Sequence, residues 1–201
     1  MLDKSIKHYG VIMVKSIGEA YPRFPLPEGY QFCRFADGDV NDWAEIEFSA
    51  GEFDEIQEAL NYFHKEFGES RSDILKRCIF IEDSNGEKVA TGMAWFGKLN
   101  GVELSRVHWI SVKETHQNKG LCKGLISKIL EIYDEISEEK DIYLTTQTWS
   151  YKAINIYKKF GFRAYDDRKI GMQEGSAGNY ECDFEDAWML INKKLSEYEK
   201  R

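Results

Sequence analysis

A polar turn that contains a glycine offers the clearest chemistry in the sequence. Residues 113–120 (KETHQNKG) follow a strand-like run, Val107–Val112, and precede a segment with helical periodicity that begins at Leu121. The first amides of a helix have no internal acceptor, and the helix dipole places partial positive charge at the same end. Gly120 would let a ligand approach the backbone without a Cβ in the way. The turn therefore predicts a site for an anion, such as the pyrophosphate of a nucleotide-like cofactor.

Three other side chains have types that suit proton transfer. His108 lies in the strand-like run, Glu103 is a weaker candidate on the same strand, and Tyr157 lies in a segment with helical periodicity. Imidazole changes charge near neutral pH and phenol can donate a proton, so these groups suit a base and an acid. The alternative for each is a structural role. Simple alternation places His108 on the same face as Ile110 and Val112, whereas a β-bulge would re-aim it.

Alternating or apolar runs predict the strands that would position these residues. The expected strands are Tyr9–Lys15, Tyr30–Phe35, Cys78–Glu82, Lys88–Phe96, Val102–Val112, Ile142–Trp149 and Ala187–Ile191. Asn85-Gly86 supplies the positive φ angles of a tight hairpin turn. The strand at 142–149 is expected to run parallel to the strand at 102–112 through a right-handed crossover.

Helical periodicity predicts four helices. Two lie within residues 40–67, the third spans 121–136, and the fourth follows Ser150 and ends at Gly161. Asp39 and Ser150 are candidate N-caps. All three prolines lie in residues 22–27, which predicts an extended connector.

Composition excludes several classes of protein. The 201-residue chain has a formal net charge of −8, which argues against sequence-independent nucleic-acid binding. The four cysteines form no C-x-x-C pair, and the histidines show no metal-ligand spacing, so neither a metal site nor a disulfide framework is expected. No run of about 18 apolar residues predicts a membrane span. The N-terminus lacks the features of a signal peptide, so a cytoplasmic protein is expected.

Two segments together resemble a known family. Gln117–Cys122 (QNKGLC) resembles the acyl-CoA pyrophosphate loop, Q/R-x-x-G-x-G/A, of the GNAT superfamily of N-acetyltransferases, with Cys122 where that family has Gly or Ala. Ala153–Phe162 (AINIYKKFGF) is similar to its second signature, A-x-x-x-Y-x-x-x-G-F. The resemblance covers about residues 75–165. It implies a mixed α/β (α+β) fold whose central sheet has about seven strands, splays between strands 4 and 5, and carries helices on both faces.

The resemblance also implies a division of the chain and a cofactor. Residues 1–29 would form an N-terminal extension, with a strand and the proline-rich connector, and residues 30–201 the acetyltransferase domain. The cofactor would be acetyl-CoA, with its pantetheine arm on strand 4 and its pyrophosphate on the amides of the turn. The implied cofactor-binding residues are Ile110, Ser111, Val112, Gln117, Asn118, Lys119, Gly120, Leu121, Cys122, Lys123, Ser150 and Ala153. Ser150 stands where the family often has asparagine, and Cys122 could be either a reactive thiol or a small residue tolerated beside the phosphates.

The implied reaction is acetyl transfer to a primary amine of a small molecule, or of a protein or peptide, by direct attack in a ternary complex. His108 would be the base, directly or through water, and Tyr157 the acid that protonates the coenzyme A thiolate. Candidates for the acceptor pocket are Trp43, Phe48, Phe53, Glu103 and Trp149, although core packing is the alternative for the aromatic ones. The polar segment 166–185 would be a further wall of this pocket.

Two other functional classes stay open. The chain could be a catalytically weak or inactive acyl-CoA-binding or regulatory module of the same fold, or a purely structural interaction domain. No nucleic-acid or membrane partner is expected, whereas an exposed last strand could pair two copies in a homodimer. The sequence does not identify the acceptor amine, the acyl length or the oligomeric state.

Overall fold

The computed structural model describes residues 2–136, 141–165 and 180–199, which form seven strands, six α-helices and two short 3-10 helices. The strands are β1 (Gly10–Ser16), β2 (Tyr30–Arg34), β3 (Cys78–Asp83), β4 (Lys88–Leu99), β5 (Val102–Val112), β6 (Asp141–Gln147) and β7 (Arg163–Ala164). The helices are α1 (Val40–Ala50), α2 (Ile56–Phe67), α3 (Arg71–Arg77), α4 (Leu121–Ile136), α5 (Tyr151–Lys159) and α6 (Tyr180–Glu199). The 3-10 helices are η1 (Glu114–His116) and η2 (Thr148–Ser150).

The described residues divide into two compact units. The first comprises residues 23–95 and 107–136, and the second comprises residues 2–22, 96–106, 141–165 and 180–199. The boundary passes through β4 and β5, so both strands contribute to each unit. The strands follow the order β2-β3-β4-β5 in the first unit and continue as β5-β6-β1-β7 in the second, with β5 and β6 parallel. The expected mixed α/β class with seven strands is confirmed.

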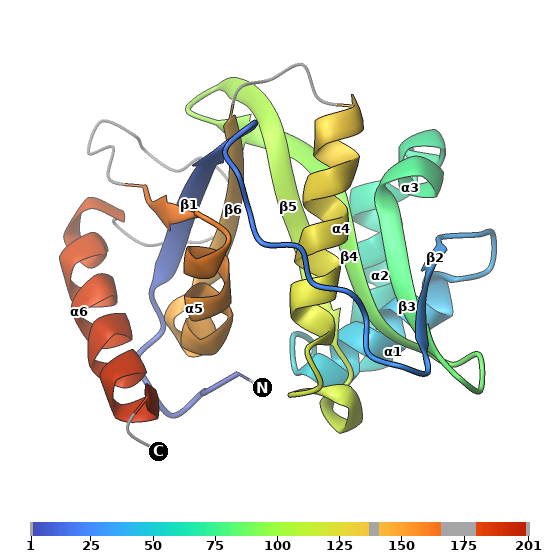
Figure 1. The fold of residues 1–201 in the computed structure, drawn as a ribbon, viewed down its shortest axis with the longest axis horizontal. Coiled ribbons are helices and arrows are strands. Elements are labelled where there is room, and N and C mark those ends of the chain that lie inside the picture. Colours follow the sequence, from blue (N-terminus) through green and yellow to red (C-terminus); the bar gives the residue numbers. More distant parts are fainter. Residues whose placement is uncertain (1, 137–140, 166–179, 200–201) are drawn as a thin grey trace. The chain divides into compact units, whose positions relative to one another are not determined.

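In the first unit, helices cover both faces of the strands (Figure 1). On one face, Phe67 of α2 lies 5.1 Å from Trp95 of β4, and Phe63 stacks on Phe35, measured between ring centroids. On the other face α4 covers Gly92 of β4, where leucine and isoleucine side chains of the helix occupy the space that a Cβ would need. The aromatic core of this unit therefore lies between the strands and the helices α1 and α2. The prediction of two separate helices within residues 40–67 is confirmed.

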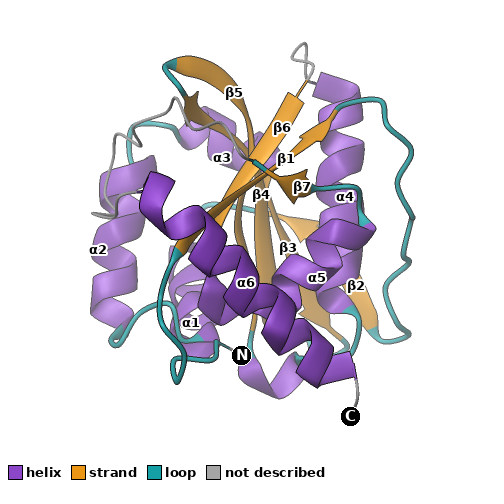
Figure 2. Cartoon of the chain, turned by 90° about the vertical axis from the view of Figure 1, so that its left-hand side faces the viewer, coloured by secondary structure: helices purple, strands orange, loops and turns teal. Residues whose placement is uncertain are grey.

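In the second unit, β1 is an internal strand. It pairs antiparallel with β6 along its whole length, from Gly10 opposite Gln147 to Ser16 opposite Asp141. Its other edge pairs with β7 through Met13 and Val14. The segment 1–29, which the sequence sets apart as an extension, thus contributes a strand with neighbours on both sides. Helix α6 packs against β1 and α5 (Figure 2).

The strand expected at Ala187–Ile191 is wrong, because this segment lies within α6. Ala187, Ile191 and Leu195 are buried at a spacing of four residues, as on one face of a helix, whereas Met189 is 67% exposed. A short apolar run has no period that separates strand from helix, so the pattern was ambiguous. The sequence suggested a homodimer formed by pairing of an exposed last strand. Because this segment is helical, the structure gives no support for such pairing.

The helix starts are built differently from the prediction. Asp39 and Ser150 occupy the N-cap positions of α1 and α5, but neither side chain makes a capping hydrogen bond. The Asp39 carboxylate instead accepts hydrogen bonds from the Ala36 amide and from the Lys88 ammonium, at 2.8 and 2.9 Å. At the other end of α5, Gly161 has φ +88°, as expected for a residue that ends a helix. Helix α3 was not predicted.

Because Met13 of β1 is fully buried, Met13→Ala should destabilise the protein by about 2–5 kcal/mol. Met189→Ala removes the same atoms from an exposed position on α6 and should change stability by less than about 0.5 kcal/mol. Urea unfolding of both variants measures the difference. Equal stabilities would contradict the internal position of β1.

Candidate active site

We interpret the left-handed conformation of Trp109 as a β-bulge, which sets the geometry of β5. Trp109 has φ +48°, in the left-handed region that aromatic residues rarely adopt. The His108 ring lies 6.1 Å from the ring of Phe67 on α2, so His108 faces α1 and α2. Ile110 faces the opposite side, because its Cδ1 lies 2.7 Å from the place that a Cβ on Gly92 would occupy under α4. Of the two possibilities for His108, simple alternation is therefore wrong and the re-aimed side chain is found, because of the positive φ at Trp109.

Aromatic rings hold the bulge in place. The Trp109 ring stacks on Phe53 at 5.7 Å with an interplanar angle of 20°. Edge contacts to Tyr62 and Trp43, at 5.1 and 5.2 Å between centroids, enclose the same ring. A residue in a sparsely populated backbone region costs about 1–3 kcal/mol and persists only where its surroundings fix it. The aromatic cluster supplies that fixation.

The turn after β5 has the geometry of a backbone anion site. Asn118 and Gly120 have φ +63° and +87°, and α4 begins at Leu121 as predicted. The Gln117 side-chain amide donates to the Val112 carbonyl at 3.0 Å and so ties the turn to the end of β5. Across the described residues, no backbone carbonyl accepts from the amides of residues 118–122. These amides lie at the positive end of the α4 dipole.

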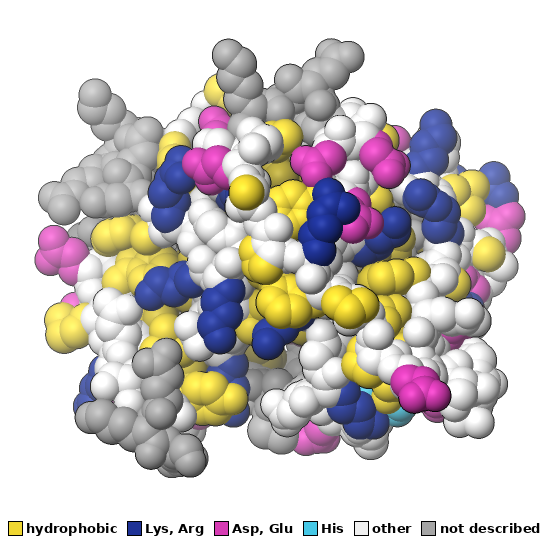
Figure 3. All heavy atoms as spheres, viewed as in Figure 1, with side chains coloured by type: hydrophobic (Ala, Val, Ile, Leu, Met, Phe, Trp, Pro, Cys, Tyr) yellow, Lys and Arg dark blue, Asp and Glu magenta, His cyan; other side chains and the backbone are white. Residues whose placement is uncertain are grey.

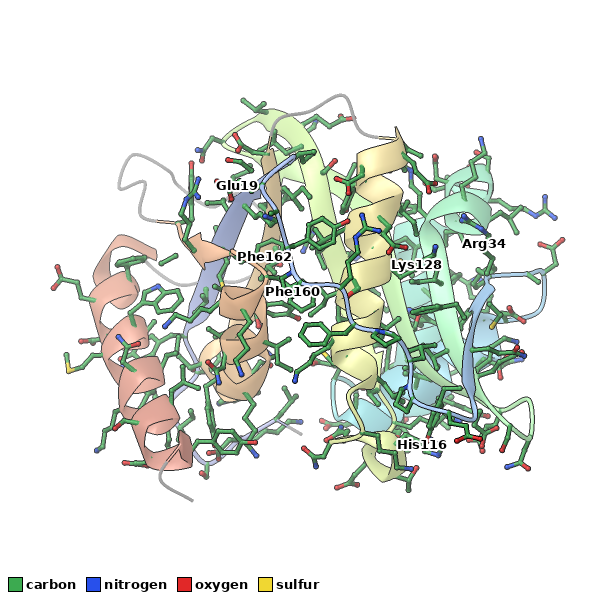
Figure 4. All side chains as sticks on the ribbon, in the orientation of Figure 1. Glu19, Arg34, His116, Lys128, Phe160 and Phe162 are labelled. Atoms are coloured by element: carbon green, nitrogen blue, oxygen red, sulfur yellow. The ribbon has the colours of Figure 1, made fainter. Side chains whose placement is uncertain are left out.

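The amide of Lys123, the last residue of the expected turn, has an acceptor within the chain. The Lys123 amide donates to the Gly120 carbonyl at 3.0 Å, inside the first turn of α4. Its ammonium group lies 5.1 Å from the centre of the Phe24 ring. The Lys119 ammonium donates to the Tyr30 hydroxyl at 3.2 Å, beside His116 (Figure 4). Both lysines therefore place positive charge near the turn.

The proline-rich connector lies along α4. The Phe24 amide donates to the Ser127 hydroxyl at 3.0 Å, and Arg23 pairs with Glu131 at 3.2 Å. Leu26 fills the space above Gly124, where a Cβ would lie 2.6 Å from the leucine Cδ2. The face drawn in Figure 3 mixes basic, acidic and hydrophobic side chains, without a continuous basic surface.

The structure adds a carboxyl group that the prediction missed. Glu47 of α1 is 0% exposed, and its Oε2 accepts a hydrogen bond from the Ser111 hydroxyl of β5 at 2.6 Å. Its Oε1 has no hydrogen-bond partner among the described residues. Burial raises the pKa of Glu47 well above the ordinary value, while the bond from Ser111 opposes this change. Helical periodicity was the available signal, because Glu47 lies four residues after the buried Trp43.

The Cys122 thiol is not activated by its place at the start of α4. Its side chain is half-buried, and loss of hydration raises its pKa to about 12. A thiol with a raised pKa is a poor nucleophile near neutral pH. Of the two possibilities for Cys122, the structure thus favours a small residue tolerated within the turn.

The second unit carries Tyr157, Ser150, Ala153, Trp149 and Glu103. Tyr157 of α5 is buried, and its backbone carbonyl accepts from the amides of the two residues that close the helix, Phe160 and Phe162. Trp149 binds the N-terminal segment, because its indole N–H donates a hydrogen bond to the Ile6 carbonyl at 2.8 Å. Glu103 is exposed on β5.

The expected acceptor residues of the first unit differ in exposure. Trp43 is fully buried, Phe53 is half-buried against Trp109, and Phe48 is 42% exposed. The structure thus brings His108, Trp43 and Phe53 together around the bulge. Of the segment 166–185, residues 166–179 lie outside the described residues, and the remainder begins α6.

The described residues hold neither a metal-ligand cluster nor a membrane-spanning helix. Across residues 2–136, 141–165 and 180–199, no cluster of three or more His, Cys, Asp or Glu side chains could hold a metal ion. Over the same ranges, no helix combines the length and apolar character needed to cross a membrane.

Comparison with known proteins identifies one family. Residues 39–162, more than half of the chain, match the acetyltransferase (GNAT) family. A curated relative, the spermidine N(1)-acetyltransferase of Vibrio cholerae serotype O1, is 27% identical over 121 residues, which are 60% of this chain and 63% of the relative. This chain thus spans less than two thirds of that relative.

Solved structures show the same fold. A GCN5-related N-acetyltransferase from Sphaerobacter thermophilus superposes with a TM-score of 0.62 at 16% identity, over 78% of this chain and 48% of that one. Another, from Kribbella flavida, gives a TM-score of 0.51 at 18% identity, over 77% of this chain and 53% of that one. The chain spans about half the length of these two proteins.

Glu47 should make stability depend on pH. Its raised folded-state pKa favours the protonated form, so its stabilisation is complete below the unfolded-state pKa, near 4.5, and is lost as the pH rises through the folded-state pKa. The unfolding free energy of the wild type minus that of Glu47→Gln should fall by about 1.4 kcal/mol per pH unit between the two pKa values. Urea unfolding from pH 5 to 8 measures it. A difference that is independent of pH would contradict the assignment.

Proposed function

Because the chain belongs to the acetyltransferase (GNAT) family, we propose that it transfers an acetyl group from acetyl-CoA to a primary amine. The observation that carries this proposal is the row of backbone amides at residues 118–122, which lack acceptors within the described chain and lie at the head of α4. The curated relative is named for acetylating spermidine, and this supports a small amine as the acceptor. A protein or peptide amine is the alternative acceptor.

The cofactor would bind mainly through backbone. In this proposal the amides of residues 118–122 bind the pyrophosphate, and Lys119 and Lys123 add positive charge. The backbone of Ile110 and Val112 binds the pantetheine arm in the manner of an added strand. Ala153 is assigned to the cofactor only by its position in the second signature, and Ser150 only because it lies three residues before that alanine.

The proposed reaction divides its proton transfers between two side chains. His108 takes a proton from the acceptor ammonium, directly or through water, and the neutral amine attacks the acetyl carbonyl. The amide of Val112 polarises that carbonyl and stabilises the oxyanion. After the new C–N bond has formed, the C–S bond breaks and the leaving thiolate takes the phenolic proton of Tyr157. The nitrogen then loses a proton to solvent, and solvent returns a proton to the Tyr157 phenolate.

A binding module without turnover is the alternative function. The departures from the family pattern at Cys122 and Ser150 are the observations that favour it, and the Ser150 side chain makes no capping bond at the start of α5. Calorimetry with acetyl-CoA, followed by thiol release over a broad panel of amines, separates the two functions. Absence of binding in the micromolar range would count against both. Binding with only slow hydrolysis of acetyl-CoA would favour the module.

Tyr157→Phe should retain acetyl-CoA affinity within about twofold and lower kcat roughly 100-fold, because it removes only the hydroxyl group that donates the proton. The matched control is Tyr151→Phe, which changes another buried tyrosine of α5. Thiol release under saturating acetyl-CoA measures kcat, and calorimetry measures affinity. An unchanged kcat in Tyr157→Phe would remove this residue from the mechanism.

A further inference from the structure

A buried carboxyl oxygen without a partner requires a physical explanation. Glu47 is fully buried, yet across the described residues its Oε1 accepts no hydrogen bond. Leaving a buried acceptor unsatisfied is unfavourable, and most such groups in folded proteins are paired. The other oxygen, Oε2, is held by Ser111 at 2.6 Å, so the orientation of the carboxyl group is fixed from β5. One acceptor is therefore held in place for a donor that the described chain does not supply.

An aromatic cluster that suits a cation lies on the face of β5 that also carries Ser111, the hydrogen-bond partner of Glu47. Trp43, one helical turn before Glu47, contacts Trp109, which also contacts Phe53 and Tyr62 at 5.7 and 5.1 Å between ring centroids. The last three rings are only half-buried. The faces of such rings attract ammonium and guanidinium groups. The cluster thus offers a partly open aromatic surface on the same side of β5 as the buried carboxyl group.

The groups around Glu47 supply no cation that would stabilise its ionised form, whereas a bound ammonium group would. The groups that face it are Ser111 from β5, Cys78 from β3, and Glu52 from the loop after α1. Over the described ranges, no lysine or arginine forms an ion pair with Glu47. The neighbouring Glu45 is different, because it is exposed and lies 3.4 Å from the Lys113 ammonium. Only one of these two carboxylates on α1 is therefore without a cation.

We propose that Glu47 anchors the ammonium group of the acceptor amine through Oε1, with the Phe53, Tyr62 and Trp109 rings around the alkyl chain. This inference rests on the proposed acetyl transfer and names a residue that determines the acceptor. Ser111 adjoins Val112, the proposed donor to the acetyl carbonyl, so an ammonium group held at Glu47 lies beside the reacting end of the cofactor. Glu47 holds the ammonium group, and His108, on the same face of β5, takes its proton.

The test compares two isosteric substitutions on one helix. With butylamine and spermidine as acceptors, Glu47→Gln should raise the KM for the amine roughly 10- to 100-fold, the effect of losing a charge-assisted hydrogen bond. The KM for acetyl-CoA should stay within about twofold. Glu45→Gln makes the same change at an exposed position and should alter neither constant. Ser111→Ala retains the Glu47 carboxyl group but removes the hydrogen bond that orients it, so its amine KM should lie between those of the other two variants.

The outcomes separate this inference from the proposed function. Equal amine KM values in Glu47→Gln and Glu45→Gln would overturn the anchor, and so would a parallel rise in the KM for acetyl-CoA. If the wild type acetylates no amine, calorimetric titration of butylamine into the coenzyme A complex tests the anchor by binding alone. Binding that Glu47→Gln abolishes would support the anchor even though acetyl transfer had failed. Absence of binding to the wild type would overturn the anchor as well.

Discussion

The bulge at Trp109 is the constraint on which the rest of the site depends. An extended β5 would direct His108 and Ile110 to one face, whereas the positive φ at Trp109 directs them to opposite faces. The same irregularity directs Ser111 toward α1, where it holds Glu47. One strained residue, fixed by surrounding aromatic rings, therefore lets a single strand serve α4 on one side and the candidate acceptor region on the other.

Backbone and side chains carry different parts of the candidate function. The turn before α4 offers amides whose positions follow from the left-handed φ angles at Asn118 and Gly120 and from the bond between Gln117 and Val112. The face toward α1 and α2 offers a carboxyl group and aromatic rings. Anion binding thus depends on the path of the chain, whereas selection of the acceptor depends on side chains. Such a division would let the acceptor change while the cofactor site is retained.

The sequence predicted what is local and missed what depends on tertiary pairing. The turn, the start of α4 at Leu121 and the end of α5 at Gly161 were predictable, because glycine and helical periodicity act over a few residues. The strand β1 was expected within an extension, because no local pattern shows which strand becomes its neighbour. Ala187–Ile191 was mistaken for a strand because a short apolar run has no period that separates a strand from a helix. Glu47 was overlooked because a carboxylate in a helix is usually exposed, although its spacing of four residues from Trp43 places it on the buried face of α1.

Hydrogen exchange at single-amide resolution tests the central claim most directly. Saturating acetyl-CoA should slow exchange of the amides of residues 118–122 strongly, because the pyrophosphate would become their acceptor. The turn between β4 and β5 is an internal control, since Asn100 and Gly101 also have positive φ angles, +58° and +75°, but no proposed contact with the cofactor. Their exchange should not change. If acetyl-CoA binds and the amides of residues 118–122 exchange as fast as before, the account is contradicted.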